Sequence, residues 1–186
     1  MARRSWRNNS LESNVTPMPD MLVNLLNLPK NDDTEAILAR EGIVIRRAMA
    51  PDKFRVVPFV QSLSGISAAG ECDVCFSHSP ISEFVATDGA TLIGYSCYNA
   101  TAPDFFGPTA VDPAYRGKGV GKALLIRALQ ALYDEGYVYA VIGGVGPIPF
   151  YEKTVGATVI PDSDPGIYKD FIGNLEQQET KKPTEI

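Results

Sequence analysis

The sequence has few of the residues on which several classes of protein depend. Its 186 residues include three cysteines, one histidine and one tryptophan. An odd set of three cysteines does not make the disulfide framework of a small secreted domain, so we expect reduced thiols and a cytoplasmic protein. The single histidine, His78, is not accompanied by a G-x-S-x-G motif, which is the local signature of an α/β-hydrolase nucleophile.

Long hydrophobic runs and excess positive charge are also missing. The longest apolar stretch near the N-terminus, Met21 to Leu28, is interrupted by two asparagines and is far shorter than the ~20 residues of a membrane-spanning helix. The net charge is −5, so the whole chain lacks the basic surface typical of nucleic-acid-binding proteins. We therefore expect neither a membrane nor a nucleic acid as a partner.

What remains is the composition of one soluble α/β domain, with 45% hydrophobic and 21% charged residues. Apolar periodicity and turn residues predict helices and strands in alternation along the chain. The predicted strands are 43–45, 82–87, 91–98, 105–111, 137–142, 157–160 and 166–171. The predicted helices are 33–40, two short ones within 51–63 because of Pro58, 120–133 and 147–155, while 64–80 is expected to be partly loop.

A glycine-rich turn connects the strand at 105–111 directly to the most strongly periodic helix. It reads Arg116-Gly117-Lys118-Gly119-Val120-Gly121-Lys122. Unpaired backbone N–H groups and the positive end of the helix dipole point outward at a helix start, and glycines let an anion approach them closely. The pattern therefore predicts a phosphate site, and its alternative is a glycine cap that binds nothing.

Two known phosphate motifs do not fit this turn. A P-loop requires a glycine where Arg116 stands and Ser or Thr where Ala123 stands, and a dinucleotide G-x-G-x-x-G requires glycine at Lys122. The pattern that fits is R-x-x-G-x-G, from Arg116 to Gly121.

With this pattern the sequence resembles the GNAT superfamily of N-acetyltransferases. VDPAYRGKGVGKALL is similar to the family's acyl-CoA pyrophosphate loop and helix, and FYEK with the following Gly-Ala is similar to its next helix and turn. The resemblance covers about residues 43–171. It implies a GNAT-like α/β fold, with a mixed, mostly antiparallel central sheet, splayed parallel strands and helices on both faces.

The resemblance also implies a division of the chain. We expect residues 1–40 to form a partly disordered arm with a short helix, residues 41–173 the acetyltransferase domain, and residues 174–186 a polar tail. It implies acetyl-CoA as co-substrate without a metal, a small-molecule or peptide amine as acceptor, and a possible homodimer.

The roles of individual residues follow from the same resemblance. The implied CoA-binding residues are Thr109, Ala110, Val111, Arg116, Gly117, Lys118, Gly119, Val120, Gly121 and Lys122. Tyr151 is the implied acid that protonates the thiolate leaving group, and a backbone N–H near Val111 is the implied oxyanion donor. The implied activity is acetyl transfer to a primary amine by direct attack in a ternary complex. Gly144 stands where many members have asparagine, so the alternative is a non-catalytic acyl-CoA sensor or partner-binding module.

Other groups are weaker candidates. Cys72-x-x-Cys75-x-x-His78 offers three possible zinc ligands, fewer than a structural site normally uses, so we expect no metal. Asp104 and Glu83 are candidate general bases, although both are expected at the surface. Tyr95, Tyr98 and Tyr168 are candidates to line an acceptor pocket, or else belong to the core.

Overall fold

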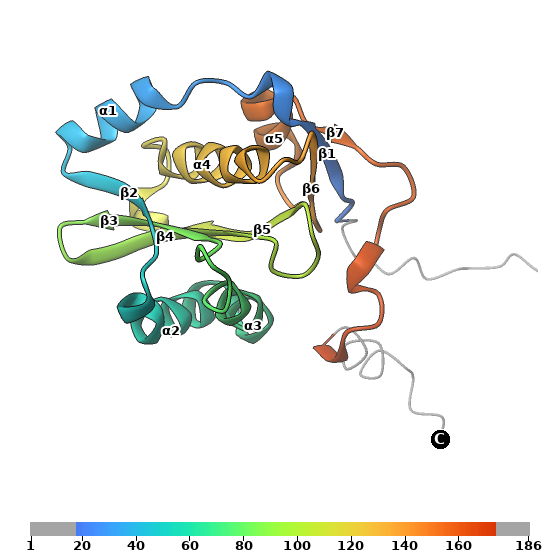
Figure 1. Cartoon of the computed structure of the whole chain (residues 1–186), viewed down its shortest axis with the longest axis horizontal. Helices are drawn as coiled ribbons and strands as arrows, with labels where there is room; N and C mark the ends of the chain where they lie inside the picture. The colour runs from blue at the N-terminus through green and yellow to red at the C-terminus, as the bar shows by residue number, and fades with distance from the viewer. Residues whose placement is uncertain (1–17, 174–186) are drawn as a thin grey trace, which may run out of the picture.

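The computed structural model describes residues 18–173 of the chain (Figure 1). The strands of this part are β1 (Met21–Asn24), β2 (Ile43–Arg47), β3 (Glu83–Asp88), β4 (Thr91–Tyr98), β5 (Phe105–Val111), β6 (Tyr139–Ile142) and β7 (Thr158–Val159). Its α-helices are α1 (Asp32–Arg40), α2 (Lys53–Ser64), α3 (Ile66–Cys75), α4 (Val120–Asp134) and α5 (Ile148–Val155). Its short 3-10 helices are η1 (Leu25–Asn27), η2 (Ala50–Asp52), η3 (Pro113–Tyr115) and η4 (Gly166–Tyr168).

The strands form one sheet in the order β2-β3-β4-β5-β6-β1-β7. Every neighbouring pair is antiparallel except β5 and β6, which are parallel. Helices α2 and α3 cover one face, and α1, α4 and α5 lie on the other (Figure 1). The predicted fold class, a mostly antiparallel sheet with one parallel pair and helices on both faces, is therefore confirmed.

The structure corrects the prediction for the start of the chain. Met21–Asn24 was expected in an arm outside the domain, but β1 lies within the sheet and pairs with β6 and β7. Met21 and Val23 are completely buried, because alternate residues of a strand point to the same face of a sheet. The arm residues 1–17 and the predicted tail 174–186 lie outside the described residues.

The helices on the other face also differ from the prediction. One continuous helix, α2, replaces the two expected around Pro58. The ring of Pro58 faces solvent, whereas Val56 and Val60 face the core, so the missing backbone hydrogen bond costs no buried partner. Helix α3 replaces a predicted loop, and small residues such as Ala69 and Cys72 form its buried face.

Two further comparisons concern the end of the chain and the membrane. The predicted strand at 166–171 is wrong, since Gly166–Tyr168 forms η4 instead. None of the helices in residues 18–173 combines the length and the apolar character that crossing a membrane requires.

Candidate active site

The two parallel strands separate soon after they meet. β5 and β6 pair only at Phe105 with Val141 and at Phe106 with Ile142. β5 then continues to Val111 along β4, with a register shift between Ser96 and Tyr98, whereas the chain leaves β6 through Gly143. The register shift places a bulge at Gly107-Pro108 in the pairing with β4. Pro108, which lacks an N–H, falls where β5 has no partner from β6.

A cavity of about 700 Å³ opens where the strands separate. Its wall from β5 and β6 includes Phe106, Thr109 and Ile142, and Tyr151 contributes from α5. Of the residues predicted to bind CoA, Thr109 lines this cavity, while Ala110 and Val111 continue along β5 toward the glycine-rich loop. The splayed strands therefore create a hollow that opens beside an unpaired stretch of backbone.

The glycine-rich loop lies between the end of β5 and the start of α4. The Asp112 carboxylate accepts a hydrogen bond from the Ala114 N–H at 2.9 Å and begins the turn. Gly117 and Gly119 have φ angles of +80° and +94°, which favour glycine over any residue with a side chain. Helix α4 starts at Val120, so the first N–H groups of this helix have no partner within it. Arg116, Gly117 and Lys118 are exposed.

The cations of the loop have only weak partners. Lys118 Nζ is 3.5 Å from a Glu41 carboxylate oxygen, with both side chains about half exposed, and 5.7 Å from the centre of the Tyr115 ring. Arg116 donates a hydrogen bond to the Val111 carbonyl at 3.2 Å. Tyr115 also donates to Asp88 at 2.9 Å, and this contact ties the loop to the β3–β4 hairpin.

Tyr151 faces the cavity from the first turns of α5. Its side chain is 7% exposed and packs edge to face against Phe106 and Phe150. Burial raises its pKa to about 12, because a phenolate loses more hydration than a phenol does. The side chain is consequently a neutral hydroxyl at physiological pH.

The opposite wall is acidic and aromatic. Glu71 on α3, Asp164, Tyr168 and Phe171 line the cavity, and the residues that the structure assigns to its lining include no lysine, arginine or histidine. Tyr168 donates a hydrogen bond to Glu71 Oε1 at 3.0 Å, and Thr101 Oγ1 donates to the same oxygen. The carboxylate is therefore held in place by two hydroxyl groups.

Glycines make room for this wall. A Cβ atom at Gly143 would lie 3.2 Å from the Phe105 ring and 3.3 Å from the Tyr168 ring. Gly144 has a φ of +55°, and its N–H donates to Asp20 at 2.8 Å. The close approach of Tyr168 therefore requires glycine at 143, whereas a Cβ at Gly144, where the resemblance leads one to expect asparagine, would make only an ordinary contact with Tyr168 at 3.7 Å.

Sequence reasoning placed some of these residues correctly and others not. Among the three tyrosine candidates, Tyr168 lines the cavity, whereas Tyr95 and Tyr98 are completely buried in the core. Neither candidate base lines the cavity. Asp104 is half-buried at the start of β5, and Glu83, which was expected at the surface, is completely buried. Glu71 belongs to no motif, so no local signal could have identified it.

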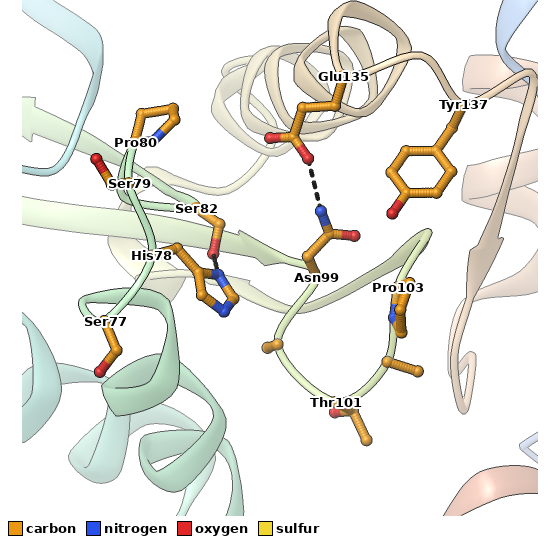
Figure 2. A pocket seen from close by; sticks show the side chains of 12 residues that line it. Ser77, His78, Ser79, Pro80, Ser82, Asn99, Thr101, Pro103, Glu135 and Tyr137 are labelled. Carbon is orange, nitrogen blue, oxygen red and sulfur yellow. Dashed lines mark hydrogen bonds between the residues drawn. The ribbon is translucent and has the colours of Figure 1, made fainter.

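The cysteine and histidine candidates are separated. His78 lines a second cavity of about 650 Å³, where its Nδ1 is 2.7 Å from Ser82 Oγ (Figure 2). In the same cavity Asn99 donates a hydrogen bond to Glu135 at 2.8 Å. Apart from His78, this polar cavity contains none of the predicted site residues. The C-x-x-C-x-x-H spacing does not place the His78 ring in one group with Cys72 and Cys97.

Comparison with known proteins shows which domain family the central part of the chain resembles. Residues 80–154 match the model of a family described as acetyltransferase (GNAT) domain. No curated protein matches the sequence of the chain. The matched residues contain the hairpin, the glycine-rich loop and Tyr151.

Solved structures share the fold at low sequence identity. A GCN5-related glucosamine N-acetyltransferase region of a fungal multi-domain GH3 beta-N-acetylglucosaminidase has a TM-score of 0.62 at 15% identity, covering 76% of this chain and 19% of that chain. A GCN5-related N-acetyltransferase from Sphaerobacter thermophilus has a TM-score of 0.53 at 19% identity, covering 78% and 50%. Another from Kribbella flavida has a TM-score of 0.54 at 15% identity, covering 78% and 55%.

The chain thus spans a fifth of the first of these proteins and about half of the other two. At these identities the likeness concerns the fold alone. Residues 80–154 are similar to a GNAT acetyltransferase domain, and the described part of the chain shares the fold of GCN5-related N-acetyltransferases.

Proposed function

We propose that the chain transfers the acetyl group of acetyl-CoA to a primary amine, by direct attack of the amine on the thioester in a ternary complex. The observation that carries this proposal is that three features of the structure lie one after another. An exposed glycine-rich loop at the start of α4 leads to the unpaired side of β5, and this leads to a cavity that contains Tyr151. A diphosphate, an extended amide-bearing arm and a thioester follow each other in the same order in acetyl-CoA.

The loop residues Arg116 to Lys122 are the proposed diphosphate site. Its exposed backbone N–H groups and the helix dipole favour an anion. The Lys118–Glu41 pair is exposed, and such pairs contribute little stability, so the lysine can exchange its carboxylate partner for a phosphate at small cost.

The unpaired side of β5, at Thr109 to Val111, is the proposed contact for the pantetheine arm. Beyond Phe106 this stretch has no partner from β6, and backbone groups left without a partner favour addition of an extended ligand as a further strand. A backbone N–H near Val111 is the proposed donor to the oxyanion that forms when the amine attacks.

Tyr151 is the proposed proton donor to the thiolate that leaves. Its side chain lines the cavity and remains protonated, because burial raises its pKa to about 12. A neutral phenol can stabilise the developing thiolate by a hydrogen bond and then supply its proton.

The acidic wall is the proposed acceptor side. Glu71 and Asp164 favour a cationic amine electrostatically, and the rings of Tyr168 and Phe171 favour an ammonium group beside an apolar body. An ammonium ion has no lone pair, so it must lose a proton before attack. Glu71 is the carboxylate in this cavity whose orientation two hydroxyl groups fix, and we assign it the role of base. The acceptor on this proposal is a small-molecule or peptide amine.

Release of the free CoA thiol across a panel of primary amines tests the proposed function. We expect turnover, with cationic amines faster than amines that also carry a carboxylate. Thiol release by no amine, although acetyl-CoA binds, would contradict the proposal. Light scattering with and without acetyl-CoA would show whether the chain is the homodimer that the resemblance implies.

A non-catalytic acyl-CoA sensor is the second candidate function. Gly144, which replaces the family's asparagine, favours it, because one contact to the arm is missing. Calorimetry separates the candidates, since a sensor binds acetyl-CoA tightly without any amine-dependent thiol release.

A further inference from the structure

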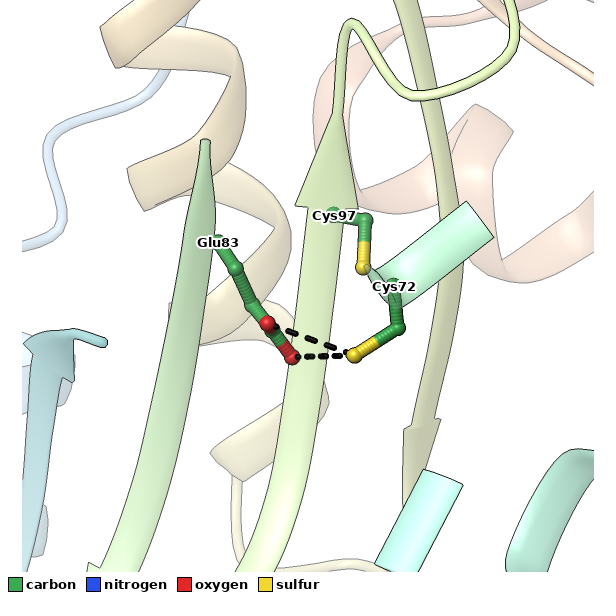
Figure 3. A group of neighbouring side chains, drawn as sticks. All are labelled: Cys72, Glu83 and Cys97. Atoms are coloured by element: carbon green, nitrogen blue, oxygen red, sulfur yellow. Dashed lines mark hydrogen bonds between the residues drawn. The ribbon is translucent and has the colours of Figure 1, made fainter. Parts of the chain in front are cut away.

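Cys72, Cys97 and Glu83 converge in the core of the molecule (Figure 3). Glu83 and Cys97 lie directly opposite each other on β3 and β4, so their side chains share one face of the sheet. Cys72 and Cys75 are three residues apart on α3, which covers that face, and residues at this spacing share a helix face. Figure 3 shows the Cys72 and Cys97 sulfurs and the Glu83 carboxylate pointing toward one another.

The side-chain atoms of this cluster are close. Cys72 Sγ lies 3.4 Å and 3.5 Å from the two carboxylate oxygens of Glu83. One ligand atom each of Cys72, Glu83 and Cys97 lies within 4.8 Å of the others. Cys75 Sγ lies outside this group and donates to the carbonyls of Glu71 at 3.5 Å and Tyr98 at 4.0 Å. Three elements that are separate in the sequence thus bring three metal-ligating groups together.

Glu83 is the residue of this cluster whose burial needs an explanation. All four side chains are 0% exposed. Cysteines are often buried as small apolar residues. A carboxylate in such a place is costly unless a cation or several strong donors compensate it or, as burial favours for Glu83, the group keeps its proton. In residues 18–173 no salt bridge reaches Glu83. The neighbouring Arg47 instead donates to the Ile81 carbonyl and the Tyr98 hydroxyl.

We propose that Cys72, Cys97 and Glu83 form a buried binding site for zinc or a similar soft divalent cation, with Cys75, on the same face of α3, as its fourth ligand. Zinc is held tetrahedrally by sulfur at about 2.3 Å and by carboxylate oxygen at about 2.0–2.2 Å, which sets adjacent sulfur and oxygen ligands about 3.5 Å apart. Cys72 and Glu83 already have this separation. The other pairs among Cys72, Glu83 and Cys97 lie within 4.8 Å and need to approach by at most about 1 Å. The Cys75 sulfur must turn toward them from the Glu71 and Tyr98 carbonyls.

The composition of the cluster indicates a structural site. The protein fills all four positions, whereas a catalytic zinc keeps one open for water or substrate. Binding displaces the thiol and carboxyl protons to solvent, and it couples to folding because the ligands come together only in the folded chain. The ion fixes α3 against β3 and β4, and α3 carries Glu71, the residue immediately before Cys72, into the active-site cavity.

The experiment uses the full chain, purified under reducing conditions from a zinc-containing medium, with metal content measured by elemental mass spectrometry. We expect close to one zinc per chain. Metal-free protein titrated with Co²⁺ should give the thiolate-to-cobalt charge-transfer band and the visible bands of a tetrahedral site. Zinc should also raise the melting temperature of the metal-free protein.

Two ligand variants and a matched control complete the test. Cys97→Ser and Glu83→Gln should weaken zinc binding at least about tenfold, a loss that even outer partners of a metal site cause. His78→Ala, which removes the histidine of the C-x-x-C-x-x-H spacing but not a ligand of this cluster, should retain the metal.

The wild-type measurement decides the proposal even where a ligand variant does not fold. The proposal is overturned if the wild-type chain holds no stoichiometric zinc, or if Co²⁺ binds without a thiolate charge-transfer band. It is also overturned if His78→Ala loses zinc as completely as Cys97→Ser does.

Discussion

At the scale of single residues, the Tyr151 hydroxyl is the group on which the proposed proton transfer depends. Tyr151→Phe keeps the ring and its contacts with Phe106 and Phe150 but removes the acid. We expect kcat to fall by about a hundredfold to ten-thousandfold with little change in the melting temperature, measured by thiol release and thermal denaturation. Tyr139→Phe, at a half-exposed position on β6, is the matched control.

The pH profile adds a second readout for Tyr151. Because burial raises its pKa to about 12, the phenol remains protonated over the pH range of an ordinary assay. Tyr151 itself should therefore produce no loss of activity near pH 10, where an unshifted tyrosine titrates. Unchanged turnover in Tyr151→Phe would mean that another group protonates the thiolate.

Glu71 is the residue that gives the proposed acceptor side its charge. Glu71→Gln keeps the shape and can still accept from Tyr168, but it removes the negative charge. We expect catalytic efficiency toward a cationic amine to fall about tenfold to a hundredfold, the value of a hydrogen bond to a charged group, with unchanged affinity for acetyl-CoA. Asp73→Asn, on the same helix but paired with Lys53 at the surface, should have no such effect. Equal losses in both variants would exclude a specific role for Glu71.

At the scale of elements, the glycine-rich loop and α3 give opposite results for the same substitution. Gly117 has a φ of +80°, where an alanine costs about 1–2 kcal/mol, so Gly117→Ala should weaken acetyl-CoA binding about tenfold in calorimetry. Gly70 lies inside α3 without a positive φ, and a Cβ there meets nothing within 4 Å. Gly70→Ala should instead stabilise the fold by about 0.5–1 kcal/mol and leave the affinity unchanged.

The elements that could be predicted from the sequence are those with a strong local signal. Helix α4 has a long apolar stripe and begins after the glycine-rich loop, and both were predicted within a residue or two of their bounds. Helix α3 was not, because the small side chains of Ala68, Ala69 and Cys72 give a weak periodic signal. The prediction of two short helices within 51–63 was wrong, because a proline on the exposed side of a helix disturbs no buried contact.

At the scale of the whole molecule, the parts that could not be predicted are those that combine distant segments. Tyr151 and the loop could be proposed as site residues because each belongs to a local motif. The acidic wall joins Glu71 of α3 to Tyr168, residues 97 positions apart that form one hydrogen bond. Likewise, nothing in the first forty residues indicates that β1 pairs with both β6 and β7. Such pairings depend on tertiary contacts, which periodicity within one segment does not report.

The position of β1 leads to a prediction about the stability of the whole domain. β1 is the only link between β6 and β7 in the sheet of the described residues, and Val23 on it is 0% exposed, whereas its neighbour Leu22 is 38% exposed. Val23→Ala should lower the free energy of unfolding by about 1–3 kcal/mol, because it leaves a cavity beneath α4 and η1. Leu22→Ala removes a larger side chain but should cost less, since much of that side chain already contacts water. Urea denaturation of both variants measures the difference, and equal losses would show that β1 is not held in the sheet as described.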